Sequence, residues 1–171
     1  MAYTYSKIAS VTVGSGGASS IDFLAIPQNY TDLIVKSSIR TSYAGVSDAI
    51  TVSFNGVTTN LSSRRLYGTG ASAASTNSGS LSYGDSGVGS TATANTFSNG
   101  ELYIPNYAGS NYKSSSSDGV GENNATSTTA TLAANLWSSS AAINSISLKS
   151  ENGSTIQQYS TATLYGIKAE V

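Results

Sequence analysis

Apolar and polar side chains alternate with a period of two along most of this 171-residue chain. Ile50, Val52 and Phe54, for example, are separated by single Thr and Ser residues. Because successive side chains of a strand point to opposite faces of a sheet, this pattern predicts half-buried strands. Strand candidates run over 6–13, 20–26, 32–40, 50–55, 60–67, 100–104, 126–137, 143–150 and 160–170.

Helical signals are weak by comparison. No window combines an N-cap, a 3.6-residue period and good helix formers. The best candidate, 130–136, reads Ala-Thr-Leu-Ala-Ala-Asn-Leu, which leaves a single helical turn as the alternative to a strand there. Pro27 and Pro105 each follow an isoleucine at the end of a strand-like run, where a missing backbone donor does little harm.

The turn signals and the number of strands together predict the architecture. Asn55-Gly56 is a strong signal for a two-residue hairpin, because both residues tolerate positive φ. Glu151-Asn152-Gly153 predicts a turn before the last strands. About eight to ten strands in a single domain, 1–171, predict an all-β fold, an antiparallel β-sandwich of jelly-roll-like type.

Two polar segments interrupt the alternation. Residues 68–95 consist mostly of Gly, Ala, Ser, Thr and Asn, with Leu81 and Tyr83 as large apolar anchors, and 109–124 contains four consecutive serines. One interpretation is a pair of long flexible Gly/Ser/Thr-rich loops. The other is that the segments become ordered by lying on neighbouring subunits, because loops of this length are uncommon in a compact domain without a function.

The composition argues against most kinds of catalysis, metal binding and nucleic-acid binding. The chain contains no histidine and no cysteine, so it lacks the usual proton-transfer group, the strongest nucleophile and two leading metal ligands. Charged residues make up 10% and the net charge is −1, which gives no electrostatic footprint for nucleic acid. There is no apolar run long enough to span a membrane and no secretory signal pattern. A surface of Ser, Thr, Asn and Gly suits a permanent assembly.

One four-residue motif resembles an enzyme site. Gly84-Asp85-Ser86-Gly87 matches the nucleophile segment of chymotrypsin-like proteases. Without any histidine, however, no general base can take the serine proton, and no lysine lies in this segment to replace it. We therefore expect no catalytic residues and a protein that is not an enzyme.

Candidate metal and phosphate sites are equally weak. Asp118, Glu122, Asn123 and Asn124 supply oxygen ligands at short spacing, but without the alternating pattern of a calcium loop, so a solvated turn is favoured. The Gly-Val-Gly runs at 87–89 and 119–121 are followed by neither a lysine nor a helix. We expect no metal site, no cofactor and no cofactor-binding residues.

The remaining features concern contact surfaces. Arg64-Arg65 is the one basic pair, and its members would point to opposite faces of a strand. Eleven scattered tyrosines suit strands and interfaces, with sugar stacking as the functional alternative. Trp137 is expected to anchor the core or an interface rather than to serve as a ligand platform.

Three segments together resemble a module of tailed-bacteriophage virion proteins, particularly of phages that infect aquatic bacteria. They are 20–35 (Ser-Ile-Asp-Phe-Leu-Ala-Ile-Pro-Gln-Asn-Tyr-Thr-Asp-Leu-Ile-Val), 101–107 (Glu-Leu-Tyr-Ile-Pro-Asn-Tyr) and 160–168 (Ser-Thr-Ala-Thr-Leu-Tyr-Gly-Ile-Lys). The match is spread over most of the chain, and the middle segments 68–95 and 109–124 carry none of it. The resemblance implies an assembled, non-enzymatic β protein and no catalytic residues.

Within that class we favour a capsid decoration (cement) protein on the outer capsid surface of the virion. The resemblance implies the major capsid protein as partner and a homo-oligomer, with a trimer favoured, and neither nucleic acid nor membrane as partner. A start at Met1 and a length of 171 residues without a stalk favour decoration over a fibre. The alternatives are a tail-fibre or receptor-binding module that recognises a host glycan or protein, another head or neck component, and a cell-surface carbohydrate-binding module. With 17 charged residues in all, attachment should depend only slightly on salt.

Overall fold

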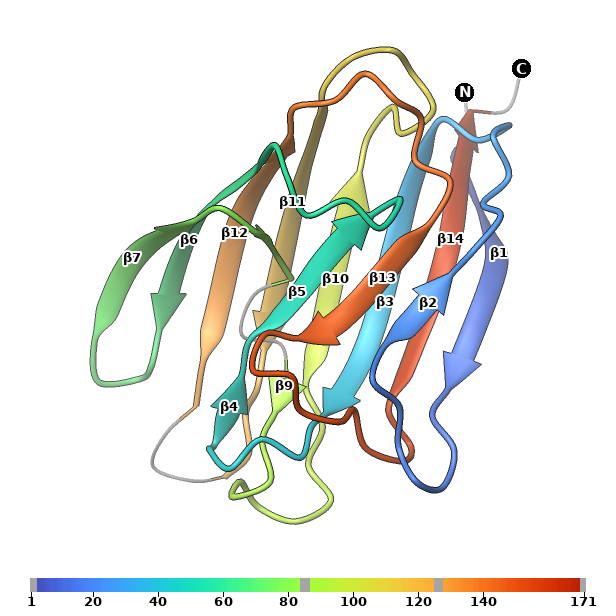
Figure 1. Cartoon of the computed structure of the whole chain (residues 1–171). Helices are drawn as coiled ribbons and strands as arrows, with labels where there is room; N and C mark the ends of the chain where they lie inside the picture. Colours follow the sequence, from blue (N-terminus) through green and yellow to red (C-terminus); the bar gives the residue numbers. More distant parts are fainter. Residues whose placement is uncertain (1–2, 84–86, 125–127, 170–171) are drawn as a thin grey trace.

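The computed structural model describes residues 3–83, 87–124 and 128–169, and these residues form strands and turns without any helix (Figure 1). Across these ranges no helix is present that could cross a membrane. Fourteen strands are found in the described ranges: β1 (Tyr3–Thr12), β2 (Ile21–Phe23), β3 (Asp32–Arg40), β4 (Ser47–Asp48), β5 (Ile50–Phe54), β6 (Leu61–Gly68), β7 (Ala73–Ser78), β8 (Leu81–Ser82), β9 (Gly87–Val88), β10 (Asn99–Ile104), β11 (Lys113–Val120), β12 (Ala130–Trp137), β13 (Ile146–Ser150) and β14 (Thr161–Ala169).

The strands form two sheets with antiparallel neighbours. The larger sheet runs in the order β1-β14-β3-β10-β11-β12-β6-β7, and the smaller in the order β2-β13-β5-β8. The short strand β9 joins the large sheet at the end of β3, in the one parallel pairing among the described strands, and also pairs with β4. The predicted all-β, antiparallel fold is therefore confirmed, and the two stacked sheets give it a sandwich-like form (Figure 1). Jelly-roll connectivity stays a prediction.

The core lies between the two sheets. From the large sheet, β3, β10 and β14 contribute inner residues such as Val35, Leu102 and Leu164, which are paired side by side across these strands. The small sheet contributes the opposite wall. The largest fully buried apolar side chains include Tyr83, Tyr107, Phe54, Ile21, Leu33, Ile39, Ile50, Leu81, Leu102, Ile104 and Ile143. Burial of these side chains is the main stabilising contribution to such a fold.

All nine segments predicted as strands contain strands. Residues 32–40 match β3 over the whole range. Segment 130–136, for which a helical turn was the alternative, lies in β12. There exposed and buried residues alternate, with Ala133, Asn135 and Trp137 buried. Trp137 packs against Phe54 with ring centroids 5.9 Å apart, so it is a core anchor, as expected.

The prediction of two long loops is corrected by the structure. Segment 109–124 contains β11, which lies between β10 and β12 inside the large sheet. Segment 68–95 contains β7, β8 and β9. Strand β11 was not predicted from the alternation of apolar and polar residues. Its buried positions carry small polar residues, including Ser115 and Ser117, instead of apolar ones. Backbone pairing on both sides holds such a strand in place without large side chains.

The two predicted turns are present, but the first is not a hairpin. Asn55 and Gly56 have positive φ values of 54° and 69°. Strand β5 before them pairs with β13 and β8, whereas β6 after them belongs to the large sheet, so the turn carries the chain from one sheet to the other. The Asn55 amide accepts from the backbone N–H groups of Asn144 and Ser145 at 2.7 and 3.1 Å, which ties down a distant connection. Gly153, with φ of 70°, completes the turn after β13.

Candidate binding surfaces

Three features of this protein could bind a partner. They are the outer face of the large sheet near β6, the free edge of β7, and a hollow at the end of the sandwich where β3 finishes. The first two belong to one region, the hairpin of β6 and β7, which extends past the small sheet (Figure 1). We call this hairpin the overhang.

An exposed apolar surface lies where the overhang meets β12. Leu66 and Leu132 are directly paired across β6 and β12, and they are 60% and 56% exposed. Val120 on β11, 43% exposed, and Ala130 on β12 occupy the next row of the same face. We call these four residues the apolar strip. Shallow hollows of about 320 and 460 Å³ border Leu66 and Leu132. An exposed apolar surface of this kind is typical of protein contact sites.

Charged groups of the same face lie beside the strip. Lys36 and Glu101 form an ion pair of 2.8 Å, and Glu101 raises the pKa of Lys36 by accepting its hydrogen bond. Asp118 is paired directly with Glu101 on one side and with Leu132 on the other. Partial burial and then the nearby charge of Glu101 raise the pKa of the Asp118 carboxyl. The strip is therefore bounded by charge on its β10 side.

The free edge of the overhang carries no charged residue that would discourage pairing with another strand. All six residues of β7 (Ala-Ala-Ser-Thr-Asn-Ser) are exposed, and none is charged. Its pairing with β6 is regular over six residue pairs, and within the described ranges no strand pairs with its other edge. Unpaired N–H and C=O groups along an uncharged edge are a template for a further strand.

The two basic residues of β6 point to opposite faces, as predicted. Arg64 is exposed on the outer face and donates to the Ser63 carbonyl at 3.0 Å. Arg65 lies on the inner face, and its guanidinium stands 5.3 Å from the centre of the Tyr67 ring. Its stacking on Tyr67 makes Arg65 part of the support of the overhang rather than a free cation.

Sequence reasoning missed two buried polar groups that stabilise the sandwich. Tyr83 is completely buried, and its hydroxyl donates towards the carbonyls of Val35 and Gly100 at 2.9 and 3.1 Å. Burial raises its pKa well above the ordinary value. Lys113 is 1% exposed, its ammonium donates to the carbonyls of Gly109 and Asn111, and burial lowers its pKa. A lysine among serines gives no sign of such burial.

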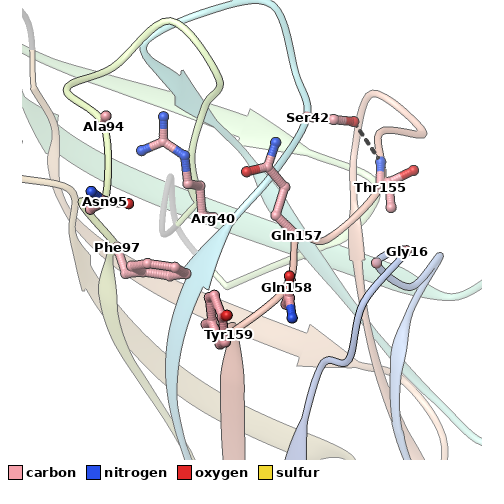
Figure 2. A pocket seen from close by; sticks show the side chains of 11 residues that line it. Gly16, Arg40, Ser42, Ala94, Asn95, Phe97, Thr155, Gln157, Gln158 and Tyr159 are labelled. Atoms are coloured by element: carbon pink, nitrogen blue, oxygen red, sulfur yellow. Dashed lines mark hydrogen bonds between the residues drawn. The ribbon is translucent and has the colours of Figure 1, made fainter.

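The third feature is a hollow of about 610 Å³ at the end of the sandwich (Figure 2). Four connections meet there: the one after β1, the one between β3 and β4, the one between β9 and β10, and the one that leads into β14. Its lining residues are Gly16, Gly17, Arg40, Ser42, Ala94, Asn95, Phe97, Thr155, Gln157, Gln158 and Tyr159.

Tyr159 in this hollow has an unusual backbone. Its φ is 71°, and it occupies the third position of a turn closed by the hydrogen bond from Ser160 N–H to the Gln157 carbonyl, 3.2 Å. Glycine or asparagine is preferred there, and a bulky residue costs of order 1–3 kcal/mol. The side chain is 69% exposed, so core packing does not offset this cost.

The described residues of the chemical motifs considered from the sequence lie in strands and in the connections that follow them. The Gly84–Ser86 part of the protease-like tetrad lies outside the described residues, and Gly87 begins β9. Asp118 lies on β11, and the Glu122 carboxylate accepts from the Asn124 backbone N–H at 2.7 Å in the connection that follows. In the ranges 3–83, 87–124 and 128–169 no group of three acidic side chains is placed to hold a metal ion.

The glycines of the two Gly-Val-Gly runs have backbone roles. Gly87 and Gly119 lie inside β9 and β11. A Cβ on Gly89 would come within 2.1 Å of the Gly45 carbonyl oxygen, so close packing of two connections requires a glycine at this position.

Comparison with known proteins gives no relative: no family model, curated protein or solved structure matches this chain.

Proposed function

We propose that this protein is a non-enzymatic structural component of a tailed-bacteriophage virion, a decoration protein that binds the outer capsid surface and stabilises neighbouring capsomers. The observation that carries the proposal is the overhang, whose uncharged open strand edge lies close to the apolar strip shared by β6, β12 and β11. The proposal that the particle is a tailed-bacteriophage virion rests on the resemblance of segments 20–35, 101–107 and 160–168 to virion modules.

The overhang fits a protein partner better than a small molecule. Leu66 and Leu132 offer side chains for burial, while β7 offers backbone donors and acceptors along one line. Addition of a strand to a free edge uses main-chain hydrogen bonds for affinity and nearby side chains for specificity. Its proposed occupant is a segment of the major capsid protein.

Attachment of this kind should be nearly independent of salt. The strip and β7 hold no charged residue, and Arg64 and Asp118 lie only at its borders. Burial of apolar surface and backbone pairing are screened little by ions, unlike contacts between exposed charges. A steep loss of binding between low and moderate salt would contradict this mode of attachment.

The direct test is the position of the protein in images of intact particles. Density of this fold on the outer shell, with β7 against the capsid protein, is the expected result. Density confined to the tail or fibres would instead support the alternative of a tail-fibre or receptor-binding module.

A binding experiment isolates the contribution of the overhang. Purified shells that lack the protein are mixed with wild type or with Leu66→Lys, and bound protein is measured after sedimentation. We expect Leu66→Lys to abolish most binding, because a charge would be buried in an apolar contact. Leu24→Lys is the matched control, since Leu24 is 74% exposed and follows β2 of the small sheet, outside the apolar strip and β7. Equal binding by the two variants would exclude the overhang as the attachment site.

The number of copies in the free assembly is a separate question. The resemblance favours a homotrimer, and the open edge of β7 is a surface through which copies could also associate. Mass measurement of the purified protein, compared between wild type and Leu66→Lys, tests it. A trimer in both proteins would place the subunit contact elsewhere and leave the overhang free for the shell.

A further inference from the structure

We infer that the hollow at the end of the sandwich binds a neutral saccharide ring, with Tyr159 as the stacking surface. This site is separate from the overhang and does not depend on where the protein attaches. Its lining comes from the end of β3 and the four connections described above, whereas the overhang is built from β6 and β7. The volume of about 610 Å³ is in the range of small-ligand sites.

Two aromatic side chains supply the apolar part of the hollow. Figure 2 shows the side chains of Tyr159 and Phe97 among those that line it. Phe97 is half-buried, which fixes it against the fold, and Tyr159 is exposed. The electron-rich face of such a ring attracts the C–H groups of a flat sugar face. A strained backbone that keeps an exposed aromatic ring in place is typical of a ligand site.

Three amide side chains supply the polar part. Asn95, Gln157 and Gln158 line the hollow, and in the part of the chain that the structure describes their side chains make no hydrogen bond. By contrast, the amides of Asn55 and Asn135 are engaged in bonds that hold neighbouring segments. Each amide offers both donors and an acceptor, which matches sugar hydroxyls because these also donate and accept.

The charge of the hollow selects a neutral ligand. Arg40 is the charged residue in its lining, and its guanidinium donates to the carbonyls of Ser90, Ala92, Thr93 and Thr96 at 2.9–3.3 Å. These bonds hold the connection that carries Asn95 and Phe97, and they use both terminal nitrogens of the guanidinium. Among the residues that the structure describes, no acidic side chain lines the hollow. The walls therefore favour neither a phosphate nor an amine, and they suit a ligand that is bound by stacking and neutral hydrogen bonds.

The test is a nuclear magnetic resonance titration of the full-length protein with a panel of methyl glycosides: glucose, galactose, mannose and N-acetylglucosamine. We expect at least one glycoside to shift the side-chain signals of Tyr159, Gln157 and Gln158 in a saturable manner. Tyr159→Gly should weaken that binding at least about tenfold. Glycine suits the positive φ, so this variant removes the ring without disturbing the turn.

Tyr112→Ala is the matched control, because Tyr112 is 63% exposed but lies in the connection before β11. It should bind the glycoside like wild type. The proposal is overturned if no glycoside of the panel binds, if binding is unchanged in Tyr159→Gly, or if adenosine, a stacking ligand of another class, binds more tightly than every glycoside. Shell binding should be equal in wild type and Tyr159→Gly, so failure here leaves the decoration proposal intact.

Discussion

We call the half of the large sheet formed by β1, β14, β3 and β10 the closed half, because its inner residues are packed in the core. We call the half formed by β11, β12, β6 and β7 the open half, because it ends in an exposed strand. Inner residues of the closed half, such as Val35, Leu102 and Leu164, are at most 1% exposed. Every residue of β7 is exposed. The small sheet ends at β8, which lies against β12 and β6, whereas no residue of β7 is covered.

The two edge strands of the large sheet, β1 and β7, also differ in how well they are protected against pairing with another chain. Strand β1 carries Lys7 and has an irregularity in its register between Lys7 and Ala9, two features that discourage pairing with another chain. Strand β7 has neither a charge nor a register shift. The contrast indicates that the open half is a place for contact and the closed half is a source of stability.

The largest expected effect follows from truncation of Tyr83, which follows β8 and donates to β3 and β10 of the closed half. Tyr83→Ala should lower the free energy of unfolding by about 3–5 kcal/mol, because it leaves a cavity and two carbonyls without their donor. Leu66→Ala in the open half should change it by less than about 0.5 kcal/mol. Urea denaturation of the two variants measures the difference. Similar losses would mean that Leu66 is packed in the free protein.

A smaller effect is expected from the buried charge at the start of β11, next to the closed half. Lys113→Ala should cost about 2 kcal/mol, because the ammonium bonds to the Gly109 and Asn111 carbonyls are lost. Lys168→Ala serves as the control, since Lys168 is exposed. Denaturation at neutral pH compares them, and an unchanged midpoint for Lys113→Ala would show that the buried ammonium gives no net stability.

At the boundary between the halves, Asp118→Asn should raise stability by a few tenths of a kcal/mol at neutral pH. The pKa of Asp118 is raised in the folded protein, so ionisation costs stability as pH rises from its ordinary value of 3.8 through the folded value, and the cost persists above it. Thermal unfolding of wild type and variant should therefore coincide near the acid end and diverge towards neutral pH. A constant difference at all pH values would contradict this explanation.

The smallest effect on stability is expected at the open edge. Ser75→Lys places a charge on β7 next to Leu66, where both faces are exposed, so the unfolding midpoint should not change measurably. Binding to purified shells should nevertheless fall, because a lysine on an edge opposes strand addition. Ser10→Lys on β1 is the matched control and should bind like wild type. A loss of binding in both variants would remove the distinction between the two edges.

Much of the fold follows from local pattern, but strands β7 and β11 do not. Segments such as β3 and β5 alternate large apolar and polar residues, so their strand character is visible in the sequence. Strands β7 and β11 contain mostly small polar residues and are extended because their neighbours pair with them. Such pairing depends on contacts between distant segments, which periodicity does not encode.

The candidate sites were predicted even less completely. In β12 both strand phases carry apolar residues, so Leu132 could not be assigned to the outer face before its pairing with Leu66 was known. The turn at Gln157–Ser160 has no glycine to indicate a positive φ. Arg64 and Arg65, by contrast, were placed correctly because strand geometry alone decides their faces.

The pairing of β1 with β14 has a mechanical consequence. Tyr3 lies opposite Ala169, so the two ends of this sheet pair leave the fold side by side (Figure 1). A force that pulls those ends apart loads the hydrogen bonds of the pair one after another, as in a zipper, and the strands separate at low force. A load applied between β7 and the closed half crosses many strands of the sheet instead. A protein held by its overhang would thus keep its shape under forces that would unzip the same protein held by its ends.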